Sequence, residues 1–537
     1  PTGGTITYTY TGGSSGNITC ADGSAATLTR AANPGGTWTY AHSESGTAWT
    51  TLITDPQNNQ TNMQFQGIYE TQRQIYQGSV SPSNLLETVN TCYNNSTSPC
   101  TGAAIALPIT QRAVVPQFPS GLQSIYIYNY NSFGLLTNEY DHDYGPGGSN
   151  PLNREVDITF AALGNNINAF KQTVTVKDGT GNIKAATTYN YDETGVVAPP
   201  NQPTPQHTTV SGSRGNLTSI VYPVSGLKAT FSNYDTGQVQ TSTDVNGAQT
   251  TYTYGALTAT CGNAFPTSVS EPLSMLRSMT WNCTGGVQTS STDENNQVTS
   301  ATYNDPDFWR PASVADQQNN VTSYSYLTNP NGFSQSLSFN GNQSVANTGQ
   351  GFDGLGRPIQ VSHIHAPGAT AWDQVVQSYD SNGRLWKTSA PCVTTGPWTC
   401  PTTAQTTTYD ALNRIAQVTD AGGGSTTYTY NQNDVLVAVG PAPSGEHAKQ
   451  RQLEYDSLGR LTSVCELTTL SGSGNCGQTS AQTGYWTKYT YDALGDLLTV
   501  TQNAQATSAN QQTRSYAYDA MSRLTSETNP ESGTKTY

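Results

Sequence analysis

Two short stretches carry residue types that could do chemistry. Gly12, Ser14 and Gly16 match the Gly-x-Ser-x-Gly pattern of a hydrolase nucleophile. That motif needs a strand-to-helix turn and a partnering His and acid, whereas "TGGSSGN" is typical of a β-turn. His363 and His365 in "SHIHAP" share one strand face and could bind a metal, but no third ligand is evident near them. Neither stretch predicts a catalytic or metal site.

An acidic cluster offers a third candidate. Glu139, Asp141 and Asp143 lie together in "EYDHDYGPGG". Carboxylates and glycines of this kind can bind calcium weakly, although the order required for an EF-hand is absent. The interpretation we favour is a solvated acidic loop. The sequence therefore predicts no enzyme activity, no metal site and no cofactor.

A different set of charged residues recurs at a regular place. "LEYDSLGRLTSV" (453–464) places Asp456 and Arg460 four apart around Gly459, in a chain with only 11% charged residues. Related stretches are "QGFDGLGRPIQV" (350–361), "QSYDSNGRLWKT" (377–388), "TTYDALNRIAQV" (407–418), "YTYDALGDLLTV" (489–500) and "YAYDAMSRLTSE" (516–527). The repeat-turn residues are Phe352, Asp353, Gly356, Arg357, Tyr379, Asp380, Gly383, Arg384, Tyr409, Asp410, Arg414, Tyr455, Asp456, Gly459, Arg460, Tyr491, Asp492, Gly495, Tyr518, Asp519 and Arg523. Their recurrence favours a structural role over catalysis.

The elements that position these charges are predicted to be β-hairpins. Alternating Thr and Tyr, as in "TTYTY" (426–430), is typical of a strand whose side chains point to opposite faces. Asp456 can accept backbone N–H bonds in an Asx-turn, and Gly459 can supply the positive φ of the turn. "RLTSV" then leaves as the return strand. Asp456 and Arg460 would face each other across the turn as a surface ion pair, worth only ~0–1 kcal/mol, whose role is to fix the hairpin geometry.

Composition supports an all-β fold. The chain has 537 residues, with 31 Tyr, 51 Gly and 28 Pro, and this combination favours strands and turns over disorder. Because one hairpin buries little surface, stability requires hairpins stacked edge to edge into a long spiralling sheet. We expect a weakly repeat-like region at 1–120, degenerate repeats with loop insertions at 121–349, and well-defined repeats at 350–537. The chain opens on Pro1 and stops at Tyr537 within a motif, so we expect an internal piece of a longer repeat array.

Charge and hydropathy exclude some partners. The net charge is −14 and there is no Lys/Arg run, so nucleic-acid binding has no support. No apolar stretch approaches the 18 or more residues of a membrane-spanning helix.

The cysteines predict disulfides and an extracellular or cell-surface location. Three pairs closely bracket short loops and a fourth flanks a longer one: Cys92–Cys100, Cys392–Cys400, Cys465–Cys476 and Cys261–Cys283. Local pairs of this kind are typical of secreted proteins, with buried free thiols as the alternative. Cys20 is left over, and its partner could be upstream, in another chain, or absent. Candidate N-glycosylation sites are Asn17, Asn59, Asn94, Asn95, Asn216, Asn282, Asn320 and Asn342.

The Tyr-Asp…Gly-Arg-Leu units resemble the Rhs/YD-repeat family, which includes Rhs polymorphic toxins, the cocoon components of Tc toxins, and the teneurins. The resemblance implies a spiral β-ribbon that encloses a cargo or toxin domain and carries no catalytic residues. The Rhs-associated core with its self-cleaving aspartates does not occur in the sequence, and "TNPESGTKTY" (528–537) is a repeat turn. Self-cleavage is therefore not predicted for this chain.

Three functions remain open on these grounds. The first is a shell segment around a cargo, whose partners would be further repeats and the enclosed domain. The second is an extracellular filament or adhesin of identical subunits joined through sheet edges, in which Cys20 could link chains and glycans could coat the surface. The third is a carbohydrate-binding surface built on aromatic stripes such as Tyr126, Tyr128 and Tyr130, for which a cross-strand tyrosine ladder is the default interpretation. A shell requires a curved sheet, and a filament requires complementary edges.

Overall fold

The computed structural model describes residues 3–11, 27–45, 48–94, 100, 104–198, 210–255, 260–305, 307–328, 331–341, 343–395, 400, 403–447 and 449–537. Of the residues singled out in the sequence, Gly12, Ser14, Gly16, Asn17, Cys20, Asn95 and Asn342 lie outside this part.

The described residues form 41 strands in one long antiparallel sheet that is not closed into a barrel. Strands that are neighbours in the chain are, with local exceptions at β29 and β36, neighbours in the sheet, so the chain is one long meander. We divide it into three arcs. The predicted all-β architecture of stacked hairpins is confirmed.

The first arc contains β1 (Thr5–Thr11), β2 (Thr27–Asn33), β3 (Thr37–Ser45), β4 (Ala48–Thr54), β5 (Gln60–Gln66), β6 (Tyr69–Tyr76), β7 (Leu85–Tyr93), β8 (Gln111–Gln117), β9 (Leu122–Tyr130), β10 (Leu136–Pro146), β11 (Leu152–Phe160), β12 (Lys171–Asp178) and β13 (Ile183–Tyr191). The second arc contains β14 (Leu217–Val221), β15 (Lys228–Asn233), β16 (Val239–Thr243), β17 (Gln249–Tyr254), β18 (Pro266–Glu271), β19 (Met275–Asn282), β20 (Val287–Thr292), β21 (Val298–Tyr303), β22 (Pro311–Ala315), β23 (Val321–Thr328), β24 (Asn331–Phe339), β25 (Ser344–Phe352) and β26 (Pro358–Ile364).

The third arc contains β27 (Trp372–Tyr379), β28 (Leu385–Ser389), β29 (Cys392–Thr394), β30 (Ala404–Tyr409), β31 (Ile415–Thr419), β32 (Ser425–Asn431), β33 (Asp434–Gly440), β34 (Lys449–Tyr455), β35 (Leu461–Leu467), β36 (Gly474–Asn475), β37 (Thr483–Tyr491), β38 (Leu497–Gln502), β39 (Gln512–Tyr518), β40 (Leu524–Asn529) and β41 (Gly533–Thr536). Three single-turn 3₁₀ helices interrupt the turns: η1 (Pro82–Asn84), η2 (Pro272–Ser274) and η3 (Ser508–Asn510). No helix in the described part of the chain is long and apolar enough to cross a membrane.

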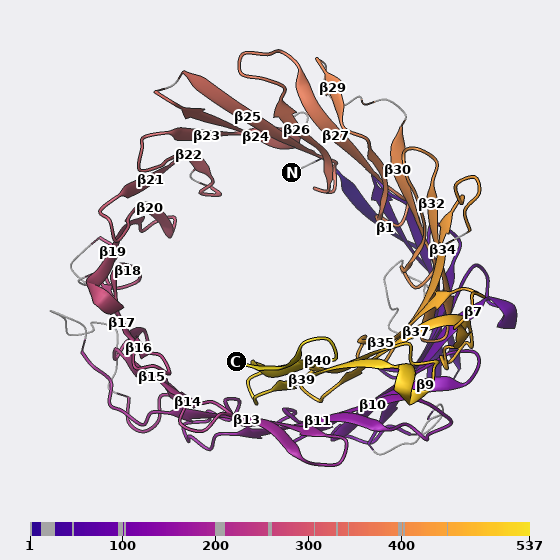
Figure 1. The fold of residues 1–537 in the computed structure, drawn as a ribbon. Helices are drawn as coiled ribbons and strands as arrows, with labels where there is room; N and C mark the ends of the chain where they lie inside the picture. The colour runs from indigo at the N-terminus through magenta and orange to yellow at the C-terminus, as the bar shows by residue number, and fades with distance from the viewer. Residues whose placement is uncertain are drawn as a thin grey trace.

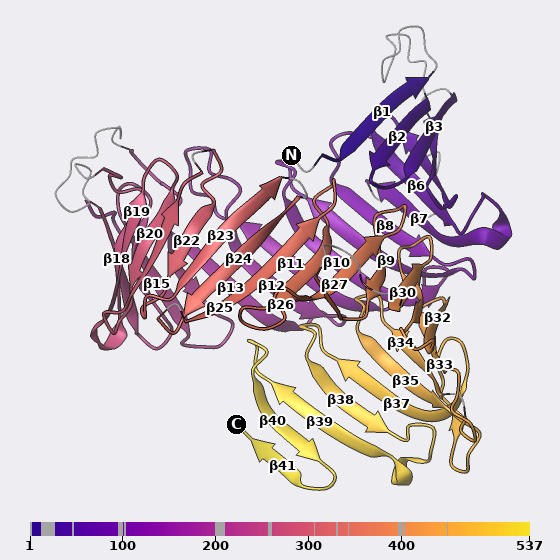
Figure 2. The same cartoon turned by 90° about the horizontal axis from the view of Figure 1, so that it is seen from above.

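The sheet coils around an axis by more than one full circle. Figure 1 shows the ribbon running round an open centre, with the third arc returning beside the first. Figure 2, seen at right angles, shows the two arcs side by side along the axis, with β38 to β41 lying farther along. Hydrogen bonds join residues 312 to 350 positions apart in the chain, so one full circle of the coil takes about that many residues.

The ribbon has two edges with different turns. In a meander every second turn lies on the same edge, so the turns after Tyr379, Tyr409, Tyr455, Tyr491 and Tyr518 share one edge, which we call the motif edge. The turns of the opposite edge, here called the plain edge, include 55–59, 118–121 and 420–424. The motif edge of the third arc meets the plain edge of the first arc, and we call this contact the seam.

The sheet is thinly covered, so few side chains are fully buried. Val115, Cys92, Cys465 and Cys476 are among the few apolar side chains that are less than 3% exposed. Polar residues such as Asp434, Gln452 and Ser219 are equally buried, so every one of their polar atoms needs a partner. The ladder of backbone hydrogen bonds and the turns therefore carry much of the stability.

Candidate functional site: repeat turns and the seam

The turn at Asp456 shows the geometry of the repeat. Gly459 N–H donates to the Asp456 carbonyl at 2.9 Å, and Asp456 N–H donates to the Arg460 carbonyl at 3.0 Å. Asp456 Oδ1 accepts the N–H groups of Leu458 at 3.0 Å and Arg460 at 2.8 Å. Gly459 has φ of 76°, the left-handed position that closes a type I turn with a G1 bulge. Asp456 therefore fixes the turn through backbone donors.

The other repeat turns have the same geometry, and the fourth position tolerates residues other than glycine. Gly356, Gly383 and Gly495 have φ of 80°, 90° and 92°. Asn413 and Ser522 take the same place with φ of 61° and 59°. Plain-edge turns that begin at Asp55, Asp178, Asp244, Asp293, Asp316 and Asp420 use the same Asx hydrogen bonds without an arginine.

An arginine completes most motif-edge turns of the third arc. Arg460 Nε donates to Asp456 Oδ2 at 2.6 Å, and the two side chains are only 18% and 3% exposed. The sequence suggested a surface ion pair, whereas this pair is mostly buried. Equivalent pairs are Arg357–Asp353, Arg384–Asp380, Arg414–Asp410 and Arg523–Asp519. The turn at Asp492 has Asp496 in place of arginine, and burial raises the pKa of Asp496.

Each buried arginine also contacts the following repeat. The guanidinium carbons of Arg357, Arg384 and Arg460 lie 4.4, 4.7 and 5.1 Å from the ring centroids of Tyr379, Tyr409 and Tyr491. Arg414 lies 3.9 Å from the ring of Tyr430. These distances fit cation–π contacts. The sequence analysis did not predict that the arginine of one repeat stacks on a tyrosine of the next. The fixed order of arginine followed by tyrosine along the chain was a signal of this contact.

The same tyrosines bond back to the preceding repeat. Tyr379 Oη donates to the Pro358 carbonyl at 2.7 Å, and Tyr491 Oη donates to the Leu461 carbonyl at 2.9 Å. In both cases the acceptor directly follows the stacking arginine in the chain. Aspartate, arginine and tyrosine therefore form one unit that ties each hairpin to the next.

The seam joins turns of the third arc to turns of the first. Asn382 Nδ2 donates to Asp55 Oδ2 at 2.8 Å. Arg384 donates to Gln57 Oε1 at 2.7 Å, and Gln57 Nε2 donates to Asp380 Oδ2 at 3.2 Å. Paired turns thus exchange side-chain hydrogen bonds across the seam.

Other seam contacts use the backbone. Gly4 N–H donates to the Gly354 carbonyl at 2.8 Å, so the seam also includes the β25–β26 turn at the end of the second arc. Ser457 N–H donates to Asp143 Oδ1 at 2.9 Å, and Tyr126 Oη donates to the Ser457 carbonyl at 2.5 Å. Burial strongly raises the pKa of Tyr144, which lies beside these contacts.

The acidic cluster is not a solvated loop. Glu139, Asp141 and Asp143 lie within strand β10. Asp141 is 1% exposed because Arg154, opposite it on β11, forms an ion pair with it. The expected loop is therefore wrong, since strand pairing with a cation buries the central carboxylate. Within the described residues no group of three or more His, Cys, Asp or Glu is placed to hold a metal ion.

The other candidate side chains are separate from this unit. His363 lies on β26 opposite Asp373, and His365 Nδ1 lies 2.9 Å from Asp373 Oδ1. The predicted tyrosine ladder is wrong, because the strand partners of Tyr126 and Tyr128 are Asp141 and Glu139 on β10. Those two tyrosines instead reach a seam carbonyl and the Arg112 guanidinium, respectively.

Four disulfides close loops away from the seam. They join Cys92 to Cys100, Cys261 to Cys283, Cys392 to Cys400 and Cys465 to Cys476, the four pairs that the sequence predicted. The first two lie on the motif edge of the first and second arcs. The last two lie on the plain edge of the third arc. Inserted loops therefore occupy the two edges that do not meet at the seam.

Most described glycosylation candidates already use their side-chain nitrogens. Asn59 Nδ2 donates to Asp55 Oδ2, Asn320 Nδ2 donates to Asp316 Oδ2, and Asn94 Nδ2 donates to the Ala106 carbonyl. The Nδ2 atom of Asn216 is buried. Asn282 accepts two turn N–H groups through Oδ1. A glycan on Asn59, Asn94 or Asn320 would have to displace hydrogen bonds of the folded chain, so glycosylation stays a prediction.

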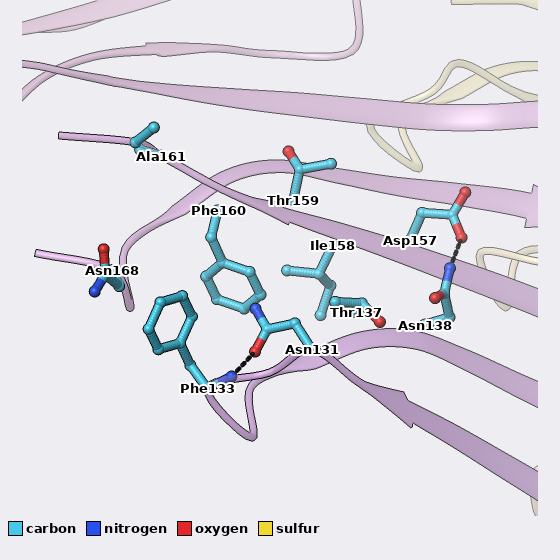
Figure 3. A pocket seen from close by; sticks show the side chains of 11 residues that line it. Asn131, Phe133, Thr137, Asn138, Asp157, Ile158, Thr159, Phe160, Ala161 and Asn168 are labelled. Atoms are coloured by element: carbon cyan, nitrogen blue, oxygen red, sulfur yellow. Dashed lines mark hydrogen bonds between the residues drawn. The ribbon is translucent and has the colours of Figure 1, made fainter. Parts of the chain in front are cut away.

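A surface pocket lies at the ends of β10 and β11 (Figure 3). Phe133 and Phe160 lie side by side in it, and Phe133 is 66% exposed. The Asp157 carboxylate in its wall already accepts from Asn138 and pairs with Lys177. The carboxylate in this wall is thus bonded within the protein.

Comparison with known proteins places this geometry in a family. The teneurin YD-shell family model matches residues 122–466, more than half of the chain. No curated protein sequence matches the chain.

A solved structure shares the fold. The crystal structure of TcdB2-TccC3 matches with a TM-score of 0.57 at 10% identity, covering 99% of this chain and 36% of that one. The crystal structure of TcdB2-TccC3-Cdc42 matches at 13% identity, with 91% and 27% coverage and a TM-score of 0.47. This chain thus spans about a third of the length of the first of these proteins. From the matched segment and its repeat turns, the chain belongs to the teneurin YD-shell family.

Proposed function

We propose that this chain is a wall segment of a protein shell that encloses a cargo or toxin domain. The observation that carries the proposal is the seam: the sheet coils past a full circle, and its third arc is hydrogen-bonded to its first. A coil whose successive circles are joined by hydrogen bonds in this way makes a continuous wall. An open sheet built for end-to-end polymerisation needs no such contact.

The repeat chemistry supports a structural role. Aspartate, arginine and tyrosine of the motif edge bond to one another and to backbone groups. Groups engaged in this way are poorly placed to act on a substrate. The proposed function is therefore mechanical, with partners that are further repeats and an enclosed domain.

An extracellular or cell-surface setting is part of the proposal. Four disulfides in one chain favour an oxidising compartment. The three sequence regions, 1–120, 121–349 and 350–537, are proposed to differ in repeat regularity within one wall. β8 and β9 pair across the first of these boundaries, and β25 runs through the second.

Electron microscopy of the purified protein, without imposed symmetry, tests the shell against the filament. We expect discrete particles whose end-on views are rings with an open centre. Continuous filaments with an axial repeat of one or a few chains would overturn the shell and support the alternative.

Protease protection tests the enclosure. In the protein isolated from its natural source, an enclosed segment should resist protease while the seam is intact. A Gly36→Ala variant, which crowds the seam, should make the same segment cleavable. Cleavage of the segment in the natural protein as fast as in the variant, with no protected fraction in either, would show that the wall encloses nothing.

A further inference from the structure

A buried pair of carboxyl groups lies in the third arc, away from the repeat turns. Asp434 on β33 and Glu454 on β34 are direct partners in the strand ladder. The Asp434 side chain has no solvent exposure, and the Glu454 carboxyl lies within hydrogen-bonding reach of it. Asp434 Oδ1 receives no hydrogen bond from a donor among the described residues. Two carboxyl oxygens that face each other without a donor require a proton or a cation between them.

A loop covers this pair and bonds to both carboxyls. Residues 476–482, here called the cover loop, follow β36. Ser480 N–H donates to Asp434 Oδ2 at 2.5 Å, and Thr479 N–H donates to Glu454 Oε2 at 2.6 Å. The loop is also attached by the Cys465–Cys476 disulfide, whose two cysteines are fully buried.

Glutamine side chains complete the attachment of the loop. Gln478 Nε2 donates to the Gln452 carbonyl at 3.1 Å, and Gln452 Nε2 donates to the Ser480 carbonyl at 2.5 Å. Gly477 lies close to the Trp486 ring, since a Cβ added to it would be 2.8 Å from Cη2. The cover loop is thus held at its start by a covalent bond and over its middle by hydrogen bonds to the sheet.

Among the residues that the structure describes, the surroundings supply no cation to neutralise the carboxyls. The cover loop and β32 contain no charged residue. Arg451 and Glu466 pair with each other on the opposite face of the sheet. Lys488 shares the face of Glu454 but lies two strands away, where it stacks over Trp486. The neighbouring turn contains the Asp456–Arg460 ion pair, whose charges compensate each other.

We propose that Asp434 and Glu454 share one proton, and that this proton holds the cover loop on the sheet, so that the loop is a pH-operated latch. With one proton between them, the carboxyls hydrogen-bond to each other and accept from the loop. When the proton leaves, two negative charges face each other in a buried site. The loop middle then separates from the sheet to admit water, while the disulfide keeps its start attached.

The direction of the pH effect follows from the environment of Asp434. Burial, together with the nearby Glu454 carboxylate, raises the pKa of Asp434 to about 7, although Ser480 donors oppose the shift. An aspartate in the unfolded chain titrates near pH ~4. The folded protein therefore binds more protons than the unfolded chain between these values, and the latch loosens as pH rises toward and above neutrality.

Hydrogen exchange measured by mass spectrometry on the whole chain tests the latch. Asp434→Asn and Glu454→Gln each mimic the protonated carboxyl with a neutral group of the same shape. At about pH 8 we expect the peptide spanning 476–482 to exchange at least tenfold faster in the wild type than in Asp434→Asn, and at about pH 5 equally fast. Comparison at one pH cancels the intrinsic pH dependence of exchange.

Two further variants distinguish the latch from a general loosening of the sheet at high pH. Glu454→Gln should reproduce the effect of Asp434→Asn, and Glu466→Gln, on the opposite face, should behave as wild type. Equal exchange of wild type and Asp434→Asn at both pH values would overturn the proposal. If calcium chloride slows exchange of the wild type at about pH 8 as much as the asparagine does, the pair binds a cation and the proton latch is wrong.

Discussion

The guanidinium of Arg460 lies 5.1 Å from the ring centroid of Tyr491, one repeat further along the chain. Arg460 also bonds Asp456 in its own turn and donates to the Asp492 carbonyl at 2.7 Å. One side chain therefore links its own turn, the next ring and the next turn. In a repeat array, stability is the sum of such links between neighbours.

Removing this arginine should weaken the array more than removing its exposed counterpart. Arg460→Gln leaves the buried Asp456 without its cation and the Tyr491 ring without its partner, so we expect a loss of about 2 kcal/mol in the free energy of unfolding. Arg523→Gln is the control: Arg523 pairs with Asp519 in the same way but is 57% exposed. Arg523→Gln should lower the free energy of unfolding by only ~0–1 kcal/mol. Urea unfolding measures both, and equal losses would show that burial and stacking add nothing.

The seam should not accept a methyl group at Gly36. A Cβ there would lie 2.3 Å from Pro56 Cβ and 2.7 Å from the Ser381 carbonyl oxygen, so turns of both arcs would have to move. We expect Gly36→Ala to destabilise the chain by about 1–3 kcal/mol and to speed hydrogen exchange in the turn at 380–384. Gly195→Ala, whose Cβ meets nothing within 4 Å, is the control. A Gly36→Ala protein with unchanged exchange in that turn would mean that the seam does not form in solution.

The rate at which each disulfide is reduced should fall as its burial increases. Cys465 and Cys476 are 0% exposed, and Cys92 and Cys100 are 2% and 6% exposed. The Cys261–Cys283 and Cys392–Cys400 pairs are half-buried. Because a reducing thiol must reach the sulfur, we expect the half-buried pairs to be alkylated roughly tenfold faster or more under mild reduction. Mass spectrometry of alkylated peptides gives the order, and in urea the four rates should converge. Rapid alkylation of Cys465 in the folded protein would contradict its burial.

Stability should be greatest at mildly acidic pH. Hydrogen bonds from Arg523 and Asn320 lower the pKa values of Asp519 and Asp316, so their contribution is present above pH ~4 and is lost as pH falls further. Asp434 acts in the opposite sense, since its raised pKa costs stability as pH rises toward about 7. Urea unfolding at a series of pH values should show a maximum between these limits. Asp434→Asn should reduce the decline on the neutral side, where Asp496 with its raised pKa also contributes, and leave the acid side unchanged.

Much of the fold could be predicted from the sequence, because the information is local. A hairpin needs only alternation and a turn, and Asp456 with Gly459 specifies the turn within four residues. Disulfides could be predicted for the same reason, since Cys92 and Cys100 bracket a short loop.

Contacts between distant parts of the chain could not be predicted. The burial of Asp141 depends on Arg154 in the next strand, and Ser457 of the Asp456 turn bonds to Asp143, 314 positions earlier. The Asp434–Glu454 pair requires the register of β33 and β34 as well as the position of a loop after β36. Such juxtapositions follow from strand register and coil circumference, which no local motif encodes.

The spacing across the seam limits which deletions and insertions the chain can accept. Hydrogen-bonded residues of the seam lie 312 to 350 positions apart, so the number of residues in one circle of the coil decides which turns meet there. If one hairpin were deleted from the second arc, the remaining strands could still pair with their neighbours. Each later turn would nevertheless lie opposite the wrong turn of the first arc. The number of hairpins per circle is therefore as constrained as any buried side chain. Loops on the two edges outside the seam, in contrast, can lengthen without changing which turns meet at the seam.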